Sequence, residues 1–154
     1  MKLRLSIKQN LLVEVTLGDD LKMRNADIQS YTTMVGFIED GKIFENGKFS
    51  RTTTKHINEI VYITGFPKQD SGQRKHFWDY PYGTRISHPD SLSSFSSQTI
   101  LKALAAGKSF FEAVSGIEKI SWRDKSIIED ILETKGLKEG FQAYRKIKGS
   151  FALL

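Results

Sequence analysis

The chain contains no cysteine, only three prolines and no long run of apolar residues. Without cysteine it can form no disulfide, no thiolate metal site and no cysteine nucleophile. No apolar segment approaches the roughly 20 residues that a membrane-spanning helix requires. Residues 1–8 alternate polar and apolar side chains rather than forming an apolar block. We therefore expect no signal peptide, no membrane partner and a cytoplasmic location.

The overall composition is that of an ordinary globular protein. The chain has 154 residues, of which 39% are hydrophobic and 27% charged, and its net charge is +5. A chain of this length buries roughly 70% of its unfolded surface, which is enough for a core. The mild basic excess favours acidic partners such as nucleic acid, although many enzymes have a similar balance.

Residues 1–50 have the pattern of an antiparallel β-meander. Runs rich in β-branched, aromatic or alternating apolar residues occupy 3–8, 11–17, 30–38 and 42–45. Turn residues separate them: Asn10 between the first two runs, Asp40-Gly41 between the last two, and Asn46-Gly47 after them. Asp-Gly and Asn-Gly favour tight hairpins because both residues tolerate positive φ.

A change of period predicts a helix over residues 53–65. Several hydroxyl side chains between Ser50 and Thr54 could cap its start, and Gly65 is placed to end it. Ile57, Ile60, Val61 and Thr64 recur at helical spacing. The β-branched residues at 60–64 leave a strand as the alternative.

The remaining residues divide into a loop and a helical region. Residues 66–92 hold all three prolines together with several aromatic residues, so we expect a long functional loop. Residues 93–149 contain apolar stripes bounded by serines and glycines, which predicts three to four helices. The expected fold class is α+β, in one domain, with the meander packed against the first helix.

The start of the predicted helix is the first candidate binding site. A helix N-terminus presents free N–H groups and the positive end of the helix dipole to an anion. Arg51, Lys55 and His56 would surround that anion with positive charge. The same residues also fit simple helix capping with solvated cations.

The second candidate lies in the loop, where basic and aromatic residues alternate. Such surfaces stack bases and hold phosphates, but Trp, Tyr and Arg are also enriched in protein-binding hot spots. The aromatic residues could equally anchor the loop to the core. The candidate binding residues are Arg74, Lys75, Trp78, Tyr80, Tyr82 and Arg85.

The sequence contains none of the catalytic or metal motifs that we considered. Its histidines, His56, His76 and His88, lack the i, i+3 or i, i+4 spacing of helical metal sites. There is no Gly-x-Ser-x-Gly elbow, and Gly107-Lys108-Ser109 lacks the upstream glycine of a phosphate-binding loop. We expect no catalytic residue, no metal and no cofactor. An enzyme acting on a nucleotide through His56 is a weaker alternative.

Two segments of the chain carry recognisable motifs: residues 30–36 read Ser-Tyr-x-Thr-x-Val, and residues 47–58 contain Phe-Ser-x-Thr-Thr-x-Lys-His-Ile. Both motifs resemble those of a group of small uncharacterised phage and plasmid proteins. The resemblance implies an accessory protein of a mobile element in a bacterial host, and no particular enzyme class. It covers about 30 residues and includes Lys55 and His56.

These observations lead to two functional hypotheses. The first is a non-catalytic phage or mobile-element protein that binds nucleic acid through its basic and aromatic residues. The second is an inhibitor or modulator of a host protein, for example an anti-defence protein, that acts by protein–protein binding. Steep salt dependence would favour the first hypothesis.

Overall fold

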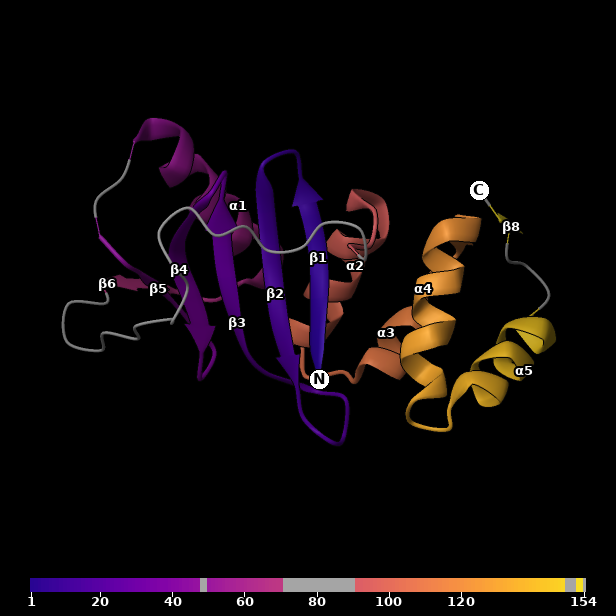
Figure 1. The fold of residues 1–154 in the computed structure, drawn as a ribbon. Helices are drawn as coiled ribbons and strands as arrows, with labels where there is room; N and C mark the ends of the chain where they lie inside the picture. Colours follow the sequence, from indigo (N-terminus) through magenta and orange to yellow (C-terminus); the bar gives the residue numbers. More distant parts are fainter. Residues whose placement is uncertain (48–49, 71–90, 149–151, 154) are drawn as a thin grey trace.

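The computed structural model describes residues 1–47, 50–70, 91–148 and 152–153. Its main feature is a six-stranded sheet in the order β1-β2-β3-β4-β5-β6 (Figure 1). The strands are β1 (Lys2–Lys8), β2 (Leu11–Leu17), β3 (Met23–Ser30), β4 (Thr33–Glu39), β5 (Lys42–Glu45) and β6 (Lys68–Asp70). Neighbouring strands from β1 to β5 are antiparallel, which confirms the predicted meander. β6 pairs parallel to β5, so the expectation of a loop is wrong for residues 68–70.

The second hairpin differs from the sequence-based expectation. The run 30–38 was expected to form one strand, but the chain turns at Tyr31 and Thr32, and residues 23–30 form β3. β3 was missed because polar side chains interrupt its pattern: Arg24, Asn25, Asp27 and Gln29. Asp27 and Gln29 are nevertheless buried, so burial here does not follow hydrophobicity.

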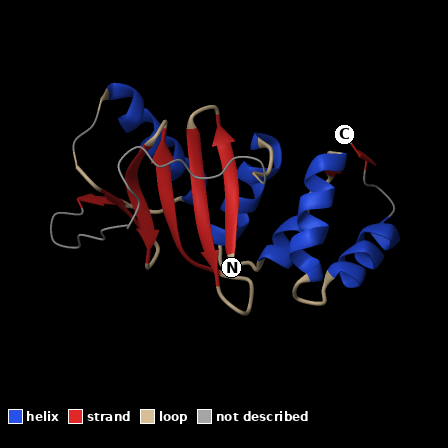
Figure 2. Ribbon diagram, viewed as in Figure 1, coloured by secondary structure: helices blue, strands red, loops and turns tan. Residues whose placement is uncertain are grey.

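Two helices cover one face of the sheet (Figure 2). They are α1 (Arg51–Thr64) and α2 (Ser94–Ala105). The expected helix over 53–65 is confirmed with a start two residues earlier, because Ser50 is the N-cap. Gly65 ends α1 at φ 73°, a left-handed conformation that glycine adopts without strain. Ile57 and Ile60 of α1 point into the core, which rules out the strand alternative.

Three further helices follow α2 and complete the predicted helical region. They are α3 (Phe110–Ser115), α4 (Trp122–Glu133) and α5 (Lys138–Lys148), and a short parallel pair joins β7 (Lys119–Ile120) to β8 (Ala152–Leu153). Ser109 and Glu112 form a reciprocal capping box at the start of α3. Ser121 accepts a hydrogen bond from the Asp124 N–H and caps α4.

One hydrophobic cluster connects the sheet with these helices. It extends from β1 to β5 through α1 and α2, and includes Phe110, Ile128, Leu132 and Phe141 from α3, α4 and α5. Leu92 continues this connection with a parallel bridge to Leu5 on the edge strand β1. None of the helices in the described residues is long and apolar enough to cross a membrane.

Candidate nucleic-acid interface

The two segments that carry the sequence resemblance meet in space at one corner of the sheet. Ser30, the last residue of β3, places its Oγ 2.6 Å from Nδ1 of His56 on α1. The same Oγ lies 3.4 Å from Oγ1 of Thr53, which in turn lies 3.3 Å from the Ser50 hydroxyl. These hydrogen bonds attach the first turns of α1 to the turn between β3 and β4. We call this group of four residues the junction.

Tyr31 occupies an unusual position above the junction. Its φ is 56°, a left-handed conformation that costs energy for a bulky residue. The Tyr31 N–H donates to the Asn10 carbonyl at 2.8 Å, and the Gln29 amide donates to the Tyr31 carbonyl at 2.7 Å. Its ring centroid lies 5.8 Å from that of His56, yet 51% of the residue is exposed. The turn therefore holds an aromatic side chain at the surface in a strained conformation.

His56 lies beneath this ring and is buried. Burial lowers the pKa of its imidazole, and the positive charge of Lys8 lowers that pKa further. A lowered pKa favours the neutral imidazole at neutral pH. The sequence pattern predicts that His56 contacts an anion together with Arg51 and Lys55. In the structure His56 instead lies buried inside the junction.

Arg51 and Lys55 are both exposed, and they belong to a longer stripe along α1. Asn58 and Tyr62 follow at i+7 and i+11 from Arg51, so all four lie on one side of the helix. Tyr62 is 86% exposed. We call Arg51, Lys55, Asn58 and Tyr62 the α1 stripe. Sequence reasoning missed Asn58 and Tyr62, although their helical spacing from Arg51 could have indicated them.

The charged residues beside the α1 stripe form ion pairs with one another. Lys68 of β6 donates to the Asn58 side-chain oxygen at 3.1 Å and also lies 3.1 Å from a Glu45 carboxylate oxygen. Glu59, the one acidic residue of α1, lies 3.9 Å from the Lys8 ammonium. The first turn of α1 contains no acidic side chain. The stripe itself thus carries two positive charges and no negative charge.

The second group of residues proposed from the sequence cannot be placed. Arg74, Lys75, Trp78, Tyr80, Tyr82 and Arg85 lie outside the described residues. His76 and His88 lie outside them as well.

A separate polar group, not expected from the sequence, lies on the face of the sheet opposite α1 and α2. One cross-strand row contains Arg4, Glu14, Asp27, Phe37 and Phe44 on five neighbouring strands. Arg4 Nε lies 3.2 Å from Glu14 Oε2, and the two phenylalanine rings stack at 4.9 Å. A useful sequence indication was Glu14, the one charged residue in the β-rich run 11–17.

Asp27 is the most perturbed member of this row. Burial raises the pKa of its carboxyl from 3.8 to about 7, against the lowering effect of Lys2, and the charge of Glu14 raises it further. One oxygen, Oδ1, has no hydrogen-bond partner among the described residues. Glu14 and Asp27 are direct register partners, and like charges in such positions repel. Asp27 therefore changes between its protonated and its deprotonated form near neutral pH.

In residues 1–47, 50–70, 91–148 and 152–153, no cluster of three or more His, Cys, Asp or Glu side chains could hold a metal.

Comparison with known proteins adds one similarity. No curated protein and no solved structure matches the chain. Residues 5–79 match the model of a family of unknown function, DUF8033. The matched stretch includes the junction, the α1 stripe and the Glu14–Asp27 pair, and the chain is similar to that family over this stretch.

Proposed function

We propose that this protein is a non-catalytic nucleic-acid-binding protein whose α1 stripe contacts the ligand. The observation that carries the proposal is the arrangement of Arg51, Lys55, Asn58 and Tyr62 on one exposed side of α1. Arg and Lys neutralise phosphates, and amide side chains hydrogen-bond to phosphates or base edges. An exposed tyrosine ring can stack on a base. The four side chains therefore combine charge, hydrogen bonding and stacking.

The junction supports this role by fixing the start of the stripe. Lys55 directly precedes His56, whose ring is held by Ser30 and lies beside Tyr31. Fixing this turn of α1 lowers the backbone conformational entropy that the segment would lose on binding. Tyr31 offers a second exposed ring at the same corner of the molecule. We include six loop residues in the proposed contact on the basis of their residue types alone: Arg74, Lys75, Trp78, Tyr80, Tyr82 and Arg85.

The test is fluorescence anisotropy with labelled single- and double-stranded DNA and RNA at several salt concentrations. Each phosphate contact contributes roughly 0.7 to 0.9 to the slope of log K against log salt. The double variant Arg51→Ala/Lys55→Ala should thus reduce this slope by about 1.5. The matched control is Lys102→Ala/Lys119→Ala, which removes two exposed cations from α2 and β7. Absence of binding by the wild-type protein at low salt would overturn the proposal.

The cellular role that we propose is that of an accessory protein of a phage or another mobile element in a bacterial host. The α1 stripe and the basic residues of the loop suit a protein that acts on nucleic acid without transforming it. Turnover of a nucleotide substrate by the wild-type protein, lost in His56→Ala, would instead identify an enzyme.

A second candidate function, binding to a host protein, is favoured by one exposed aromatic residue. Trp122 begins α4 and is 65% exposed, and the Lys125 ammonium lies 5.1 Å from its ring centroid. Tryptophan is strongly enriched in protein-binding hot spots. A defined host complex that resists nuclease and is lost in Trp122→Ala would favour this function over nucleic-acid binding.

A further inference from the structure

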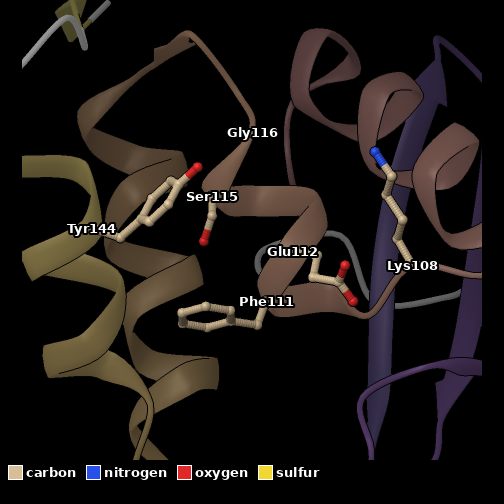
Figure 3. A pocket seen from close by; sticks show the side chains of 6 residues that line it. All are labelled: Lys108, Phe111, Glu112, Ser115, Gly116 and Tyr144. Carbon is tan, nitrogen blue, oxygen red and sulfur yellow. The ribbon is translucent and has the colours of Figure 1, made fainter. Parts of the chain in front are cut away.

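A cavity of about 370 Å³ lies beside α3, with Tyr144 of α5 at one end and Glu112 and Lys108 at the other (Figure 3). Its volume falls within the range of clefts that hold small molecules, roughly 300–1,000 Å³. The lining residues are Lys108, Phe111, Glu112, Ser115, Gly116 and Tyr144. The cavity uses no residue of the α1 stripe, of the junction or of the Glu14–Asp27 pair.

Ser115 is the residue that indicates a ligand. It is only 5% exposed, and within the part of the chain that the structure describes its hydroxyl has no hydrogen-bond partner. Buried hydroxyl groups are normally paired, because an unpaired one loses its hydrogen bonds to water without replacement. Figure 3 shows this hydroxyl on the cavity wall between Tyr144 and Phe111. A bound molecule could supply the missing partner.

The rest of the wall defines the shape and charge of that molecule. Phe111 extends from α3 and Tyr144 from α5, so aromatic rings line the cavity from two helices (Figure 3). Two rings favour a planar, unsaturated group that can stack. Lys108 supplies a cation just before α3. Glu112 supplies a carboxylate that is held in place because it accepts the Ser109 N–H at 3.2 Å.

We propose that this cavity binds a single unpaired nucleotide. Its base would pack against Phe111 and Tyr144, and the Ser115 hydroxyl and Glu112 carboxylate would hydrogen-bond to the base edge. Lys108 would pair with the phosphate. A purely apolar ligand would leave the Ser115 hydroxyl unpaired, and a simple anion without a ring would meet the Glu112 charge without using the aromatic walls.

The proposal makes a prediction about base preference. A carboxylate only accepts hydrogen bonds, so it favours bases that carry an exocyclic amino group. Adenine, cytosine and guanine have this group, whereas uracil does not. We therefore expect AMP, CMP and GMP to bind several-fold more tightly than UMP.

The test is NMR titration of the ¹⁵N-labelled full chain with AMP, CMP, GMP and UMP, and with inorganic phosphate as a control. Saturable shifts centred on the amides of Ser115 and Gly116 are expected with the nucleotides only. Ser115→Ala should keep the melting temperature, because the hydroxyl has no partner to lose, and should weaken binding several-fold. Tyr144→Ala should weaken it as well. Phe95→Ala, which removes an exposed aromatic residue of α2 outside the cavity, should leave it unchanged.

Several results would overturn the nucleotide site. These are equal shifts with inorganic phosphate, unchanged binding by Ser115→Ala, or an absence of saturable shifts with all four nucleotides. The nucleotide could be free or part of a strand, and a short single-stranded oligonucleotide added to Arg51→Ala/Lys55→Ala separates the two sources. Shifts at Ser115 with mononucleotides alone identify a free nucleotide, whereas shifts with the oligonucleotide as well identify an unpaired nucleotide of a strand. Because the α1 stripe is tested by its own variant, the two proposals fail independently.

Discussion

Ser30 and His56 share a buried hydrogen bond of 2.6 Å between Oγ and Nδ1, although 26 residues separate them in the chain. The bond joins the end of β3 to the second turn of α1. Ser30 also approaches Thr53, so one serine hydroxyl connects the sheet to two residues of the helix. This arrangement explains why two short sequence motifs that lie far apart form one structural unit. It also leaves Lys55, next to His56, exposed at a fixed position on the surface.

The burial of His56 predicts a loss of stability at acidic pH. The pKa of folded His56 is lowered below its ordinary value of 6.5, so the unfolded chain takes up the proton first. The stability that neutral His56 contributes is therefore present above that pH and lost as the pH falls below it. His56→Asn removes the titration, so the difference in unfolding free energy between wild type and variant should shrink or reverse as pH falls from about 8 to about 5. Urea unfolding at several pH values measures this, and a pH-independent difference would contradict it.

Asp27 predicts the opposite pH dependence on the other face of the sheet. Its folded pKa, about 7, is above the ordinary value of 3.8, so the folded protein keeps the proton that the unfolded chain releases. Stability from this group is present at low pH and is lost as the pH rises from about 4 to about 7. Asp27→Asn should therefore stabilise the protein at about pH 8 by roughly 1–2 kcal/mol, less than the full shift would give, since solvent and relaxation screen the charge.

The same variant carries its own control. At about pH 4 the wild-type carboxyl is protonated and neutral in the folded state, so Asp27→Asn should change stability little there. Thermal unfolding of both proteins at the two pH values gives the comparison. Equal effects at both values would show that the charge of Asp27 is not the cause.

Gly36 predicts a steric requirement in the middle of β4. A Cβ added at this position would lie 2.5 Å from the carbonyl oxygen of Phe44 on the neighbouring strand. Because the obstacle is backbone, the two strands would have to separate. Gly36→Ala should therefore cost about 2 kcal/mol or more. Gly140→Ala is the matched control, since nothing lies within 4 Å of the added atom and alanine favours the helix. Urea unfolding measures both, and similar stabilities for the two variants would contradict the prediction.

Tyr62 predicts a loss of nucleic-acid affinity without a loss of stability. The residue is 86% exposed, so its removal should change the unfolding free energy by less than about 0.5 kcal/mol. Stacking of a base on an aromatic ring is worth roughly 1–3 kcal/mol, so Tyr62→Ala should weaken binding by about 5- to 150-fold. Tyr62→Phe keeps the ring and should bind like wild type. Anisotropy titrations with one labelled oligonucleotide compare the three proteins, and full affinity in Tyr62→Ala would remove Tyr62 from the proposed interface.

The elements with clear periodic patterns were predictable, and those governed by buried polar groups were not. The meander and the helices followed from alternation, turn residues and caps such as Asn10, Gly65 and Ser121. β3 was missed because Asp27 and Gln29 are buried in spite of their polarity, a result of tertiary contacts that local pattern does not encode. Arg51 and Lys55 are exposed, whereas His56 is buried and bonded to Ser30 in a distant strand, a contact that local pattern does not encode.

Asp124 predicts how the C-terminal helices are attached to the rest of the fold. This buried residue of α4 accepts hydrogen bonds at the start of α2, from the Ser93 N–H at 3.0 Å, the Ser93 hydroxyl and the Ser96 hydroxyl at 2.8 Å. Among the described residues Ser93 makes no side-chain cap bond of its own, so the carboxylate of Asp124 caps α2 from another helix.

Loss of this cap should affect α2 more than α1. Asp124→Ala leaves three donors without an acceptor and should cost about 3 kcal/mol, whereas Asp124→Asn keeps one acceptor oxygen and should cost less. Hydrogen exchange should speed up at the first amides of α2 in Asp124→Ala, while the exchange of α1, which Ser50 caps independently, follows only the global change. Equal acceleration in both helices would show that Asp124 stabilises the fold as a whole instead of capping α2. Unchanged stability would show that the serine hydroxyls find other acceptors once the carboxylate is gone.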